Sequence, residues 1–281
     1  MVDLSASLNP FAPDVAAVAA DATATVRRYP DPAKAEALLA DVIGVDRDRL
    51  VLTNGGAEAI ALVAALEPSG HVEAPEFSLY ARHLTTVSAD APRWRSNPSN
   101  PLGQLAAPGD TARVWDEAFW PLATGTWTRG DDDTWRLGSL TKLWACPGLR
   151  LGYAIAPDPA AATALRRRQP QWSVNGIALT VTERLVALTD LAGWAAAIRD
   201  RRRELVAALE TCGLAVTDTE ACWVLVDRPG LRAELAPHGV VVRDCTSFGL
   251  PGIHRIAVPT DAELDRLVTA LRALADGAPA T

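Results

Sequence analysis

Lysine is almost absent from this chain of 281 residues. Of its 27 lysine and arginine residues, only Lys34 and Lys142 are lysines. A guanidinium stays protonated in proteins and does not act as an amine nucleophile, whereas a lysine can lose its proton in a suitable site and form a Schiff base. Covalent chemistry of a side-chain amine can therefore involve only these two residues.

Motifs for metals, hydrolysis and nucleotides are also missing. The four histidines show no ligand spacing, and no C-x-x-C pair occurs among the four cysteines Cys146, Cys212, Cys222 and Cys245. We therefore expect reduced thiols and no structural metal. The sequence has no G-x-S-x-G elbow and no G-x-x-x-x-G-K-[ST] loop, which argues against a serine hydrolase and against a nucleoside triphosphate site.

Long apolar runs and positive charge are scarce. No apolar stretch approaches the roughly 20 residues that span a bilayer, and the N-terminal residues lack the charged and apolar regions of a signal peptide. The formal net charge of −7 argues against non-specific binding to nucleic acid or to an anionic membrane. These features predict a cytosolic protein without a nucleic-acid or membrane partner.

Lys142 lies in a polar segment that leads into an apolar strand. Ser139 and Thr141 place hydroxyls on its N-terminal side, and Arg150 follows eight residues later, just before a predicted strand at 151–156. An arbitrary lysine in a loop is usually a surface charge. Hydroxyls and a guanidinium around one amine, however, indicate a phosphate-bearing aldehyde as its partner.

Short apolar strands alternate with helical stretches, which favours an α/β fold with a largely parallel sheet. A predicted helix at 33–43 is followed by a strand at 50–52, which runs into Gly55 and Gly56, and then by a helix at 57–66. A glycine turn before a helix leaves backbone N–H groups that can bind a phosphate. Such a turn more often only connects a strand to a helix, so alone it is a weak indication of a phosphate site.

Asp116 follows a predicted strand at 112–115, which comes after another predicted strand at 72–74. Open α/β sheets place functional groups just beyond the carboxyl ends of their strands, although a helix cap is the alternative role for such an aspartate. The C-terminal part indicates a small α+β domain, with strands at 221–226, 240–243 and 255–258 and a closing helix at 261–274.

Four motifs occur in order along nearly the whole chain: the segment from Leu4 to Pro10, Tyr29-Pro-Asp-Pro, Asp116-Glu-Ala-Phe and Arg243-Asp-Cys-Thr-Ser-Phe. With these motifs the chain resembles the class I/II aminotransferase family of pyridoxal-phosphate enzymes, of fold type I. The resemblance implies a large cofactor-binding domain with a mostly parallel sheet at 27–190, and a small α+β domain from 1–26 and 191–281. Within the family, the motifs look most similar to threonine-phosphate decarboxylases of cobalamin biosynthesis, and histidinol-phosphate aminotransferases are the main alternative.

The resemblance implies a role for each residue around the cofactor, pyridoxal 5'-phosphate. Lys142 would form the Schiff base and then act as the proton-transfer base. Asp116 would pair with the pyridinium nitrogen and keep it protonated. Phe77 would stack on the ring, and Asn100 would donate a hydrogen bond to the ring 3-oxygen. The cofactor phosphate would bind the backbone of Gly55, Gly56 and Ala57 and the side chains of Ser139 and Arg150.

The resemblance also implies contacts with a partner subunit and with the substrate. Tyr29 matches a tyrosine that in this family reaches the phosphate of a neighbouring subunit, which implies a homodimer with shared active sites. Arg255 matches the arginine that clamps the substrate α-carboxylate, a surface arginine being the alternative. Four further residues are candidates for a substrate phosphate, although each could simply satisfy backbone groups: Ser7, Asn9, Asn175 and Arg243.

Two features depart from the family pattern. Phe119 stands where many aminotransferases have a tyrosine that touches the ring 3-oxygen, and a phenylalanine is compatible with the decarboxylase branch. In addition, only 23 positions separate Phe77 from Asn100 and 16 separate Asn100 from Asp116, which is contracted relative to the family. We expect a strand or a crossover helix of the large domain to be missing or shortened, in either a minimal active enzyme or a degenerate relative.

The reaction depends on which bond at Cα stands perpendicular to the cofactor ring, and the sequence does not fix that torsion. Three functions follow from the resemblance. The first is a threonine-phosphate decarboxylase, the second is an aminotransferase of the histidinol-phosphate type, and the third is a non-catalytic binding protein on this fold. The joint presence of Lys142, Asp116, Arg150 and Arg255 favours an active enzyme.

Overall fold

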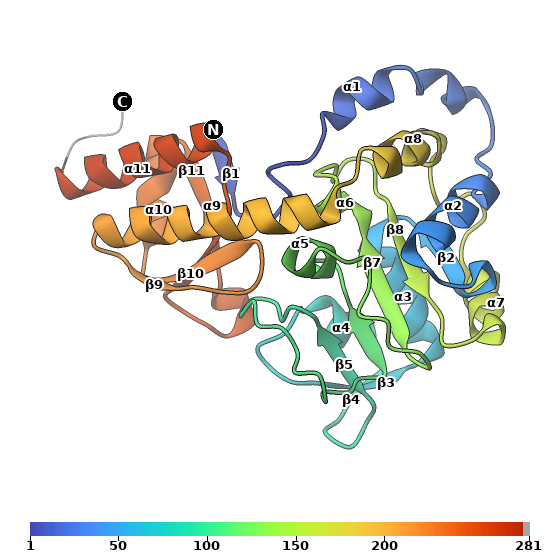
Figure 1. Cartoon of the computed structure of the whole chain (residues 1–281). Coiled ribbons are helices and arrows are strands. Elements are labelled where there is room, and N and C mark those ends of the chain that lie inside the picture. Colours follow the sequence, from blue (N-terminus) through green and yellow to red (C-terminus); the bar gives the residue numbers. More distant parts are fainter. Residues whose placement is uncertain (278–281) are drawn as a thin grey trace.

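The computed structural model describes residues 1–277 and contains a seven-stranded and a five-stranded β-sheet (Figure 1). Residues 278–281, the end of the predicted small domain, lie outside the described residues. Within residues 1–277, no helix is both long enough and apolar enough to cross a membrane.

The large sheet is mostly parallel, as the alternation of strands and helices predicts. Its strands are β2 (Leu50–Thr53), β3 (Ser69–Val72), β4 (Thr86–Val87), β5 (Arg93–Ser96), β6 (Val114–Asp116), β7 (Trp135–Ser139) and β8 (Gly152–Ile155). They lie in the order β2-β8-β7-β6-β5-β3-β4. From β7 to β4 all neighbours are parallel, whereas β8 is antiparallel to both β2 and β7.

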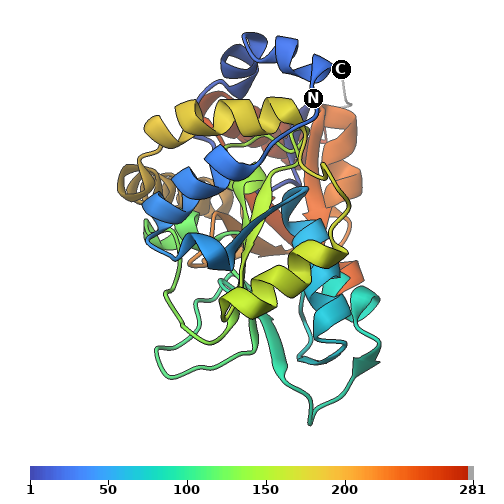
Figure 2. The same ribbon diagram turned by 90° about the vertical axis from the view of Figure 1, so that its right-hand side faces the viewer.

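Helices cover both faces of this sheet near β2, so successive residues of β2 enter different cores. Leu50 and Leu52 face a cluster with α2 (Ala33–Ile43) and α8 (Gly176–Ala187), while Val51 faces a cluster with α3 (Gly55–Leu66) and α7 (Pro159–Arg168). Figure 2 looks toward this edge of the sheet, with α2 and α8 on one side of β2 and α7 on the other. A strand buried on both faces reads as a continuous apolar run, which is why the sequence located β2.

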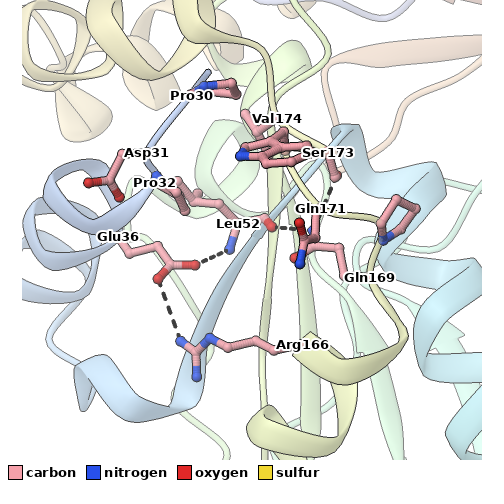
Figure 3. A pocket seen from close by; sticks show the side chains of 12 residues that line it. Pro30, Asp31, Pro32, Glu36, Leu52, Arg166, Gln169, Gln171, Ser173 and Val174 are labelled. Atoms are coloured by element: carbon pink, nitrogen blue, oxygen red, sulfur yellow. Dashed lines mark hydrogen bonds and ion pairs between the residues drawn. The ribbon is translucent and has the colours of Figure 1, made fainter. Parts of the chain in front are cut away.

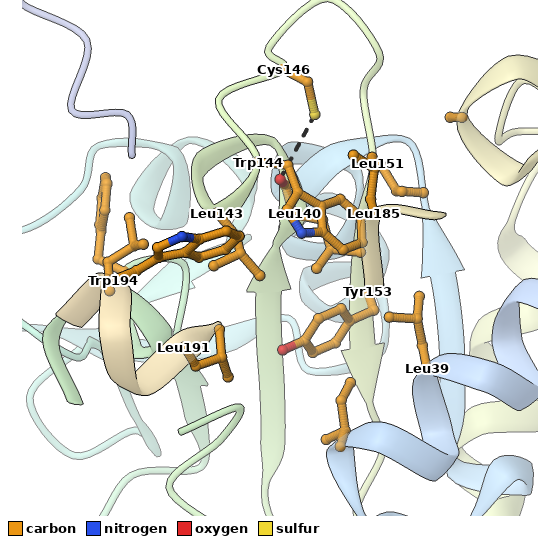
Figure 4. Packing of buried hydrophobic residues seen from close by; sticks show 14 of the residues in the cluster. Leu39, Leu140, Leu143, Trp144, Cys146, Leu151, Tyr153, Leu185, Leu191 and Trp194 are labelled. Carbon is orange, nitrogen blue, oxygen red and sulfur yellow. Dashed lines mark hydrogen bonds between the residues drawn. The ribbon is translucent and has the colours of Figure 1, made fainter. Parts of the chain in front are cut away.

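The short helix α6 (Leu140–Leu143) carries Lys142 and is fixed by the core around it. Leu140, Leu143 and Trp144 are almost fully buried and pack in one cluster with Tyr153 of β8 (Figure 4). The Trp144 indole also donates to the Thr189 hydroxyl at 2.9 Å. Because its neighbours are locked in the core, the backbone of Lys142 has little freedom to move.

The remaining helices are short, apart from two that belong to the C-terminal half. The α-helices are α1 (Val15–Ala20), α4 (Leu79–His83), α5 (Trp120–Thr124), α9 (Leu191–Thr211), α10 (Leu231–Leu235) and α11 (Asp261–Ala275). Single 3-10 turns occur at Thr23–Arg27, Arg47–Arg49, Ala236–His238 and Thr246–Phe248.

The contraction predicted before Asp116 lies in the connections of the large sheet. Residues 88–92 join β4 to β5, and residues 97–113 join β5 to β6, and neither of these described segments contains a helix. A parallel connection usually crosses the sheet through a helix. The seven-stranded sheet is therefore built with two connections that contain no crossover helix.

A stack of arginines and a tryptophan packs against the second of these connections. The Arg129 guanidinium lies 4.5 Å from the centre of the Trp115 ring and donates to the carbonyl oxygens of Ala107, Pro108 and Asp110. Arg95 pairs with the Asp110 carboxylate at 2.6 Å. Cation–π contacts and carbonyl bonds thus hold residues 103–113 over β6 in place of a helix.

One strand of the large sheet differs from its predicted position. The prediction placed it at 72–74, whereas β3 spans Ser69–Val72. The segment begins with Ser69 and Gly70, which are typical of turns. Gly70 is required because a Cβ there would clash with Leu84 and Trp94, so tertiary packing decides this strand.

The five-stranded sheet joins the N-terminus to the C-terminal part of the chain. Its strands are β1 (Val2–Leu4), β9 (Ala215–Thr217), β10 (Trp223–Asp227), β11 (Val240–Asp244) and β12 (Ile253–Ala257), in the order β1-β11-β12-β10-β9. Strand β1 pairs with β11 in parallel, and the other neighbours are antiparallel. Its core includes residues of α9 and α11.

Candidate active site

A cavity of about 410 Å³ lies at the carboxyl ends of β5, β6 and β7 and reaches the small sheet. Its size falls within the range of small-molecule sites. Open α/β sheets place their ligands at this edge. The lining residues are Ser5, Ala6, Gly56, Ala57, Ile60, Phe77, Leu79, Tyr80, Ser96, Asn100, Asp116, Ala118, Phe119, Ser139, Thr141, Lys142, Pro147, Arg150, Arg243, Phe248 and Arg255.

Lys142 reaches into this cavity from α6. Burial lowers the pKa of its ammonium group, and the nearby charges of Arg255 and Arg150 lower it further. The Nζ atom lies 5.8 Å from the centre of the Phe119 ring. A lysine with a lowered pKa has more of the neutral amine that attacks an aldehyde.

Asp116 is the last residue of β6 and is 9% exposed. Its Oδ1 accepts from the Ala118 N–H at 3.0 Å, and its Oδ2 accepts from the Tyr80 hydroxyl at 2.7 Å. Burial raises the pKa of the carboxyl, and these two donors and the charge of Lys142 oppose that rise. The bonds hold Asp116 in one orientation at the cavity wall.

Arg255 reaches from β12 across to the large sheet. Its Nη1 donates to the Asn100 Oδ1 at 2.7 Å, and its Nη2 donates to the Ser5 carbonyl oxygen at 3.3 Å. The guanidinium lies 5.0 Å from the centre of the Trp223 ring. Because the Asn100 oxygen accepts from Arg255, the Asn100 amide nitrogen is left to donate toward the cavity.

The start of α3 forms a cradle of backbone N–H groups. Gly55 has a φ of +77°, and a Cβ on this residue would clash with the Arg150 guanidinium. Gly56 faces Ser139, whose hydroxyl lies 2.8 Å from that of Thr141. Backbone donors at a helix N-terminus, hydroxyls and a guanidinium together suit a phosphate group.

Two aromatic rings line the cavity between these polar groups. Phe77 contacts Tyr80 edge-on with ring centres 5.7 Å apart, and Phe119 contacts Trp223 edge-on at 4.8 Å. The resulting site combines an amine, a buried carboxylate, a phosphate cradle and aromatic surfaces. This set of donors fits a planar, phosphorylated pyridine aldehyde.

Most of the predicted site residues meet at this cavity. Gly55 lies behind it, next to the Arg150 guanidinium. The predicted residues that line it are Gly56, Ala57, Phe77, Asn100, Asp116, Ser139, Lys142, Arg150, Arg243 and Arg255, and their individual roles stay predictions. Tyr29, Ser7, Asn9 and Asn175 are not among its lining residues in the described structure.

Ser7, Asn9 and Asn175 are held elsewhere in the fold, away from this cavity. The Asn9 amide donates to the Leu143 carbonyl at 2.9 Å. Asn175 caps α8 through the Ala178 N–H and donates to the Leu149 carbonyl at 2.7 Å. Ser7 is 1% exposed, and its hydroxyl has no hydrogen-bond partner within the described residues. Asn9 and Asn175 therefore support α6 and the loop after it.

Tyr29 lies on the surface beside a second hollow. Its side chain is 77% exposed and stacks on Trp172, with ring centres 4.4 Å apart. Figure 3 shows the hollow, of about 580 Å³, next to Pro30 and Pro32. In its wall, the Glu36 carboxylate accepts from the Leu52 N–H and pairs with Arg166. The Gln169 amide donates to the Leu52 carbonyl oxygen at 2.7 Å.

The prediction missed Tyr80, Ser96 and Phe248 among the lining residues, and it named the Thr141 hydroxyl beside Lys142 without assigning it to the site. Tyr80 could have been found from its position three residues after Phe77, because the two rings lie close along the chain and contact each other edge-on. Phe248 comes from a 3-10 turn whose place beside the cavity depends on tertiary structure.

The profile of the family described as aminotransferase class I and II matches residues 94–271. The chain belongs to this family. Threonine-phosphate decarboxylase of Salmonella typhimurium is 30% identical, with 100% of this chain and 93% of the relative covered. Histidinol-phosphate aminotransferase of Symbiobacterium thermophilum is 29% identical, with 97% and 90% covered. The first alignment has 343 positions, so at least 62 of them are gaps in this 281-residue chain.

Solved structures show the fold of the family member. The histidinol-phosphate aminotransferase of Clostridium acetobutylicum superimposes with a TM-score of 0.83 at 20% identity, covering 99% of this chain and 100% of the other. The corresponding enzyme of Sinorhizobium meliloti, solved with pyridoxal-5'-phosphate, has a TM-score of 0.74 at 19% identity, covering 97% and 91%. The chain is a fold type I enzyme whose cofactor is pyridoxal phosphate.

Proposed function

We propose that this family member is a threonine-phosphate decarboxylase. The observation that carries the proposal is a pair of guanidinium groups on adjacent strands. Arg243 and Arg255 are direct partners in the register of β11 and β12, and both line the cavity. Two cations side by side suit a substrate with two anionic groups, such as the α-carboxylate and phosphate of threonine O-3-phosphate.

Phe119 supports the same choice. It lies at the cavity where a tyrosine would add a second hydroxyl near the ring, and its own ring is fixed against Trp223. The similarity to a threonine-phosphate decarboxylase at 30% identity agrees with this reading.

In such a reaction, each of the polar residues at the cavity has a separate role. The bound cofactor supplies an electron sink for the electrons released when a bond at Cα breaks. Asp116 holds a proton on the ring nitrogen, and Arg255, oriented by its bond to the Asn100 Oδ1, fixes the substrate carboxylate at one wall. Lys142 then delivers a proton to Cα after carbon dioxide has left.

An aminotransferase of the histidinol-phosphate type is the second candidate. A relative of that name is 29% identical, which is nearly the same similarity. Histidinol phosphate has a phosphate but no carboxylate, so it would occupy only one guanidinium. The two arginines would then serve mainly the dicarboxylate acceptor of the second half-reaction.

The two functions differ in their need for an amino acceptor. The purified protein, loaded with pyridoxal phosphate, is incubated with threonine O-3-phosphate or histidinol phosphate, each with and without 2-oxoglutarate. A decarboxylase releases carbon dioxide from threonine O-3-phosphate alone. Turnover of histidinol phosphate that requires 2-oxoglutarate, with no release of carbon dioxide, would instead establish the aminotransferase. No turnover in any mixture would favour a non-catalytic protein.

We further propose that the protein is a homodimer in which Tyr29 completes the partner's phosphate site. In support, Tyr29 is 77% exposed and lies outside the cavity of its own chain. Lys142→Ala and Tyr29→Phe variants are mixed after mild dissociation. In mixed dimers one site regains both residues, so activity should recover to about a quarter of the wild-type level. A monomer in sedimentation, or no recovery on mixing, would reject this arrangement.

A further inference from the structure

Tyr80 is a buried tyrosine that the reaction described above does not use. It lies in α4 and is fully buried, with its ring against Phe77 and Trp94. Its hydroxyl donates to the Asp116 Oδ2 at 2.7 Å. A buried hydroxyl with a fixed ring and one acceptor has a defined direction, so this bond orients the carboxylate.

The surroundings of this bond favour the neutral phenol as a donor. Burial and the charges of Asp116 and Glu76 raise the pKa of Tyr80, which therefore stays protonated. Glu76 is itself fixed, because its carboxylate accepts from the Ser96 N–H at 2.9 Å and from the Ser96 hydroxyl at 2.5 Å. The ionisable groups that face Asp116 are Tyr80, Glu76 and Lys142.

Within residues 1–277, each oxygen of Asp116 has one protein donor: the Ala118 N–H for Oδ1 and the Tyr80 hydroxyl for Oδ2. In a buried site, a carboxylate that loses a donor becomes a stronger base. A proton shared between Asp116 and a ring nitrogen would then move toward the carboxyl oxygen. The hydroxyl of Tyr80 thus opposes transfer of that proton to Asp116.

We propose that Tyr80 is a positioning residue that acts through Asp116 and keeps the shared proton on the nitrogen of the cofactor ring. The inference rests on the proposed role of Asp116 as the partner of that nitrogen. It assigns a part in tuning the cofactor to α4, which begins two residues after Phe77.

The test is the protonation of the ring nitrogen in Tyr80→Phe, which keeps the ring and removes the hydroxyl. With cofactor labelled with ¹⁵N in the ring, the nitrogen chemical shift of the loaded protein reports where the proton lies. At pH 7 we expect the signal to move toward the unprotonated position, corresponding to a roughly tenfold change in the ratio of the two proton positions. Affinity for pyridoxal phosphate, measured by titration, should fall roughly tenfold as well.

Tyr153→Phe is the matched control. Tyr153 is also a buried tyrosine, but its hydroxyl donates to the Trp127 carbonyl oxygen at 3.4 Å, away from Asp116. We expect this variant to keep the wild-type nitrogen shift. A nitrogen shift in Tyr80→Phe that matches wild type would overturn the inference, as would an equal change in both variants.

Asp116→Asn separates this inference from the proposed site. If Asp116 is the ring partner, this variant alone should move the nitrogen signal, and adding Tyr80→Phe should change it no further. An unchanged signal in Asp116→Asn would refute the proposed role of Asp116 itself. A full additional effect of Tyr80→Phe in that background would show that Tyr80 does not act through Asp116.

A second variant covers the case in which Tyr80→Phe does not fold. 3-Fluorotyrosine at position 80 keeps the hydroxyl and nearly the same shape but is a stronger acid, hence a stronger donor. We expect the nitrogen signal to stay at the protonated position up to a higher pH than in wild type. A shift toward the unprotonated position would contradict the inference.

Discussion

Gly55→Ala tests the phosphate cradle, with Gly56→Ala as its matched control. Both glycines belong to the first turn of α3, but only Gly55 has a positive φ, of +77°. A Cβ on Gly55 would also clash with the Arg150 guanidinium, whereas a Cβ on Gly56 would lie 3.6 Å from the Ser139 Cβ, an ordinary contact. The same chemical change therefore meets two different environments.

The expected magnitudes follow from this difference. Alanine in the left-handed region costs about 1–2 kcal/mol, offset by about 0.4–1 kcal/mol from the reduced entropy of the unfolded chain. Gly55→Ala should therefore lower the free energy of unfolding by about 1 kcal/mol, before any cost of moving Arg150. Gly56→Ala should leave it unchanged or raise it by up to about 1 kcal/mol, because alanine is favoured in helices.

Affinity for the cofactor should separate the variants further. Displacement of Arg150 removes a charged contact to the phosphate, so Gly55→Ala should bind pyridoxal phosphate at least roughly tenfold more weakly. Urea unfolding of the cofactor-free protein gives the stabilities, and spectroscopic titration gives the affinities. The cradle is refuted if Gly55→Ala binds the cofactor as tightly as Gly56→Ala does.

Three further perturbations test the surroundings of the site. Burial raises the pKa of Glu117 to about 7, so its side chain takes up a proton on folding and the free energy of unfolding falls as pH rises from about 4.5 to 7. Glu117→Gln should remove about 3 kcal/mol of this fall, measured by urea unfolding at several pH values. An unchanged pH dependence in this variant would contradict the expectation. Arg129→Met should free residues 103–113 and speed their proteolysis, whereas Arg203→Met, at an exposed ion pair, should not. Arg243→Gln should raise the KM for threonine O-3-phosphate at least roughly tenfold with a smaller change in kcat, and an unchanged KM would exclude Arg243 as a substrate ligand.

Local pattern was sufficient to predict much of the fold. Strand β2 and the helix at 33–43 lie where they were predicted. Burial on both faces gives a continuous apolar run, and a helix gives apolar residues at helical spacing, so both patterns can be recognised in the sequence. Strand β3 was misplaced because Ser69 and Gly70 look like a turn, and only the packing of Leu84 and Trp94 makes them a strand.

The sequence indicated those candidate site residues whose type is rare in the chain or unexpected beside an apolar strand. Lys142 stands out as one of two lysines, and Asp116 as a carboxylate at the end of an apolar strand. Asn9 and Asn175 have the right polarity, but their amides bond to backbone carbonyls, which depends on contacts 134 and 26 residues away in the chain. Spacing alone could not distinguish those roles.

Contraction of the large domain was visible as short spacing, but its form was not. The short spacing between Asn100 and Asp116 predicts a missing or shortened strand or crossover helix. Sequence spacing does not say how residues 97–113 connect β5 to β6 without a helix. In the structure, Arg129 stacks on the Trp115 ring and donates to the Asp110 carbonyl oxygen, which fixes this segment. No sequence pattern around Arg129 or Trp115 indicates these contacts.

The most direct test of the central claim is the site at which the cofactor is attached. The protein is loaded with pyridoxal phosphate, reduced with borohydride, cleaved with trypsin and analysed by mass spectrometry. We predict the cofactor on the peptide of residues 137–150, which contains Lys142, and its loss in Lys142→Ala but not in Lys34→Ala. Attachment at Lys34, whose side chain is 84% exposed, or no attachment at either lysine, would contradict the account.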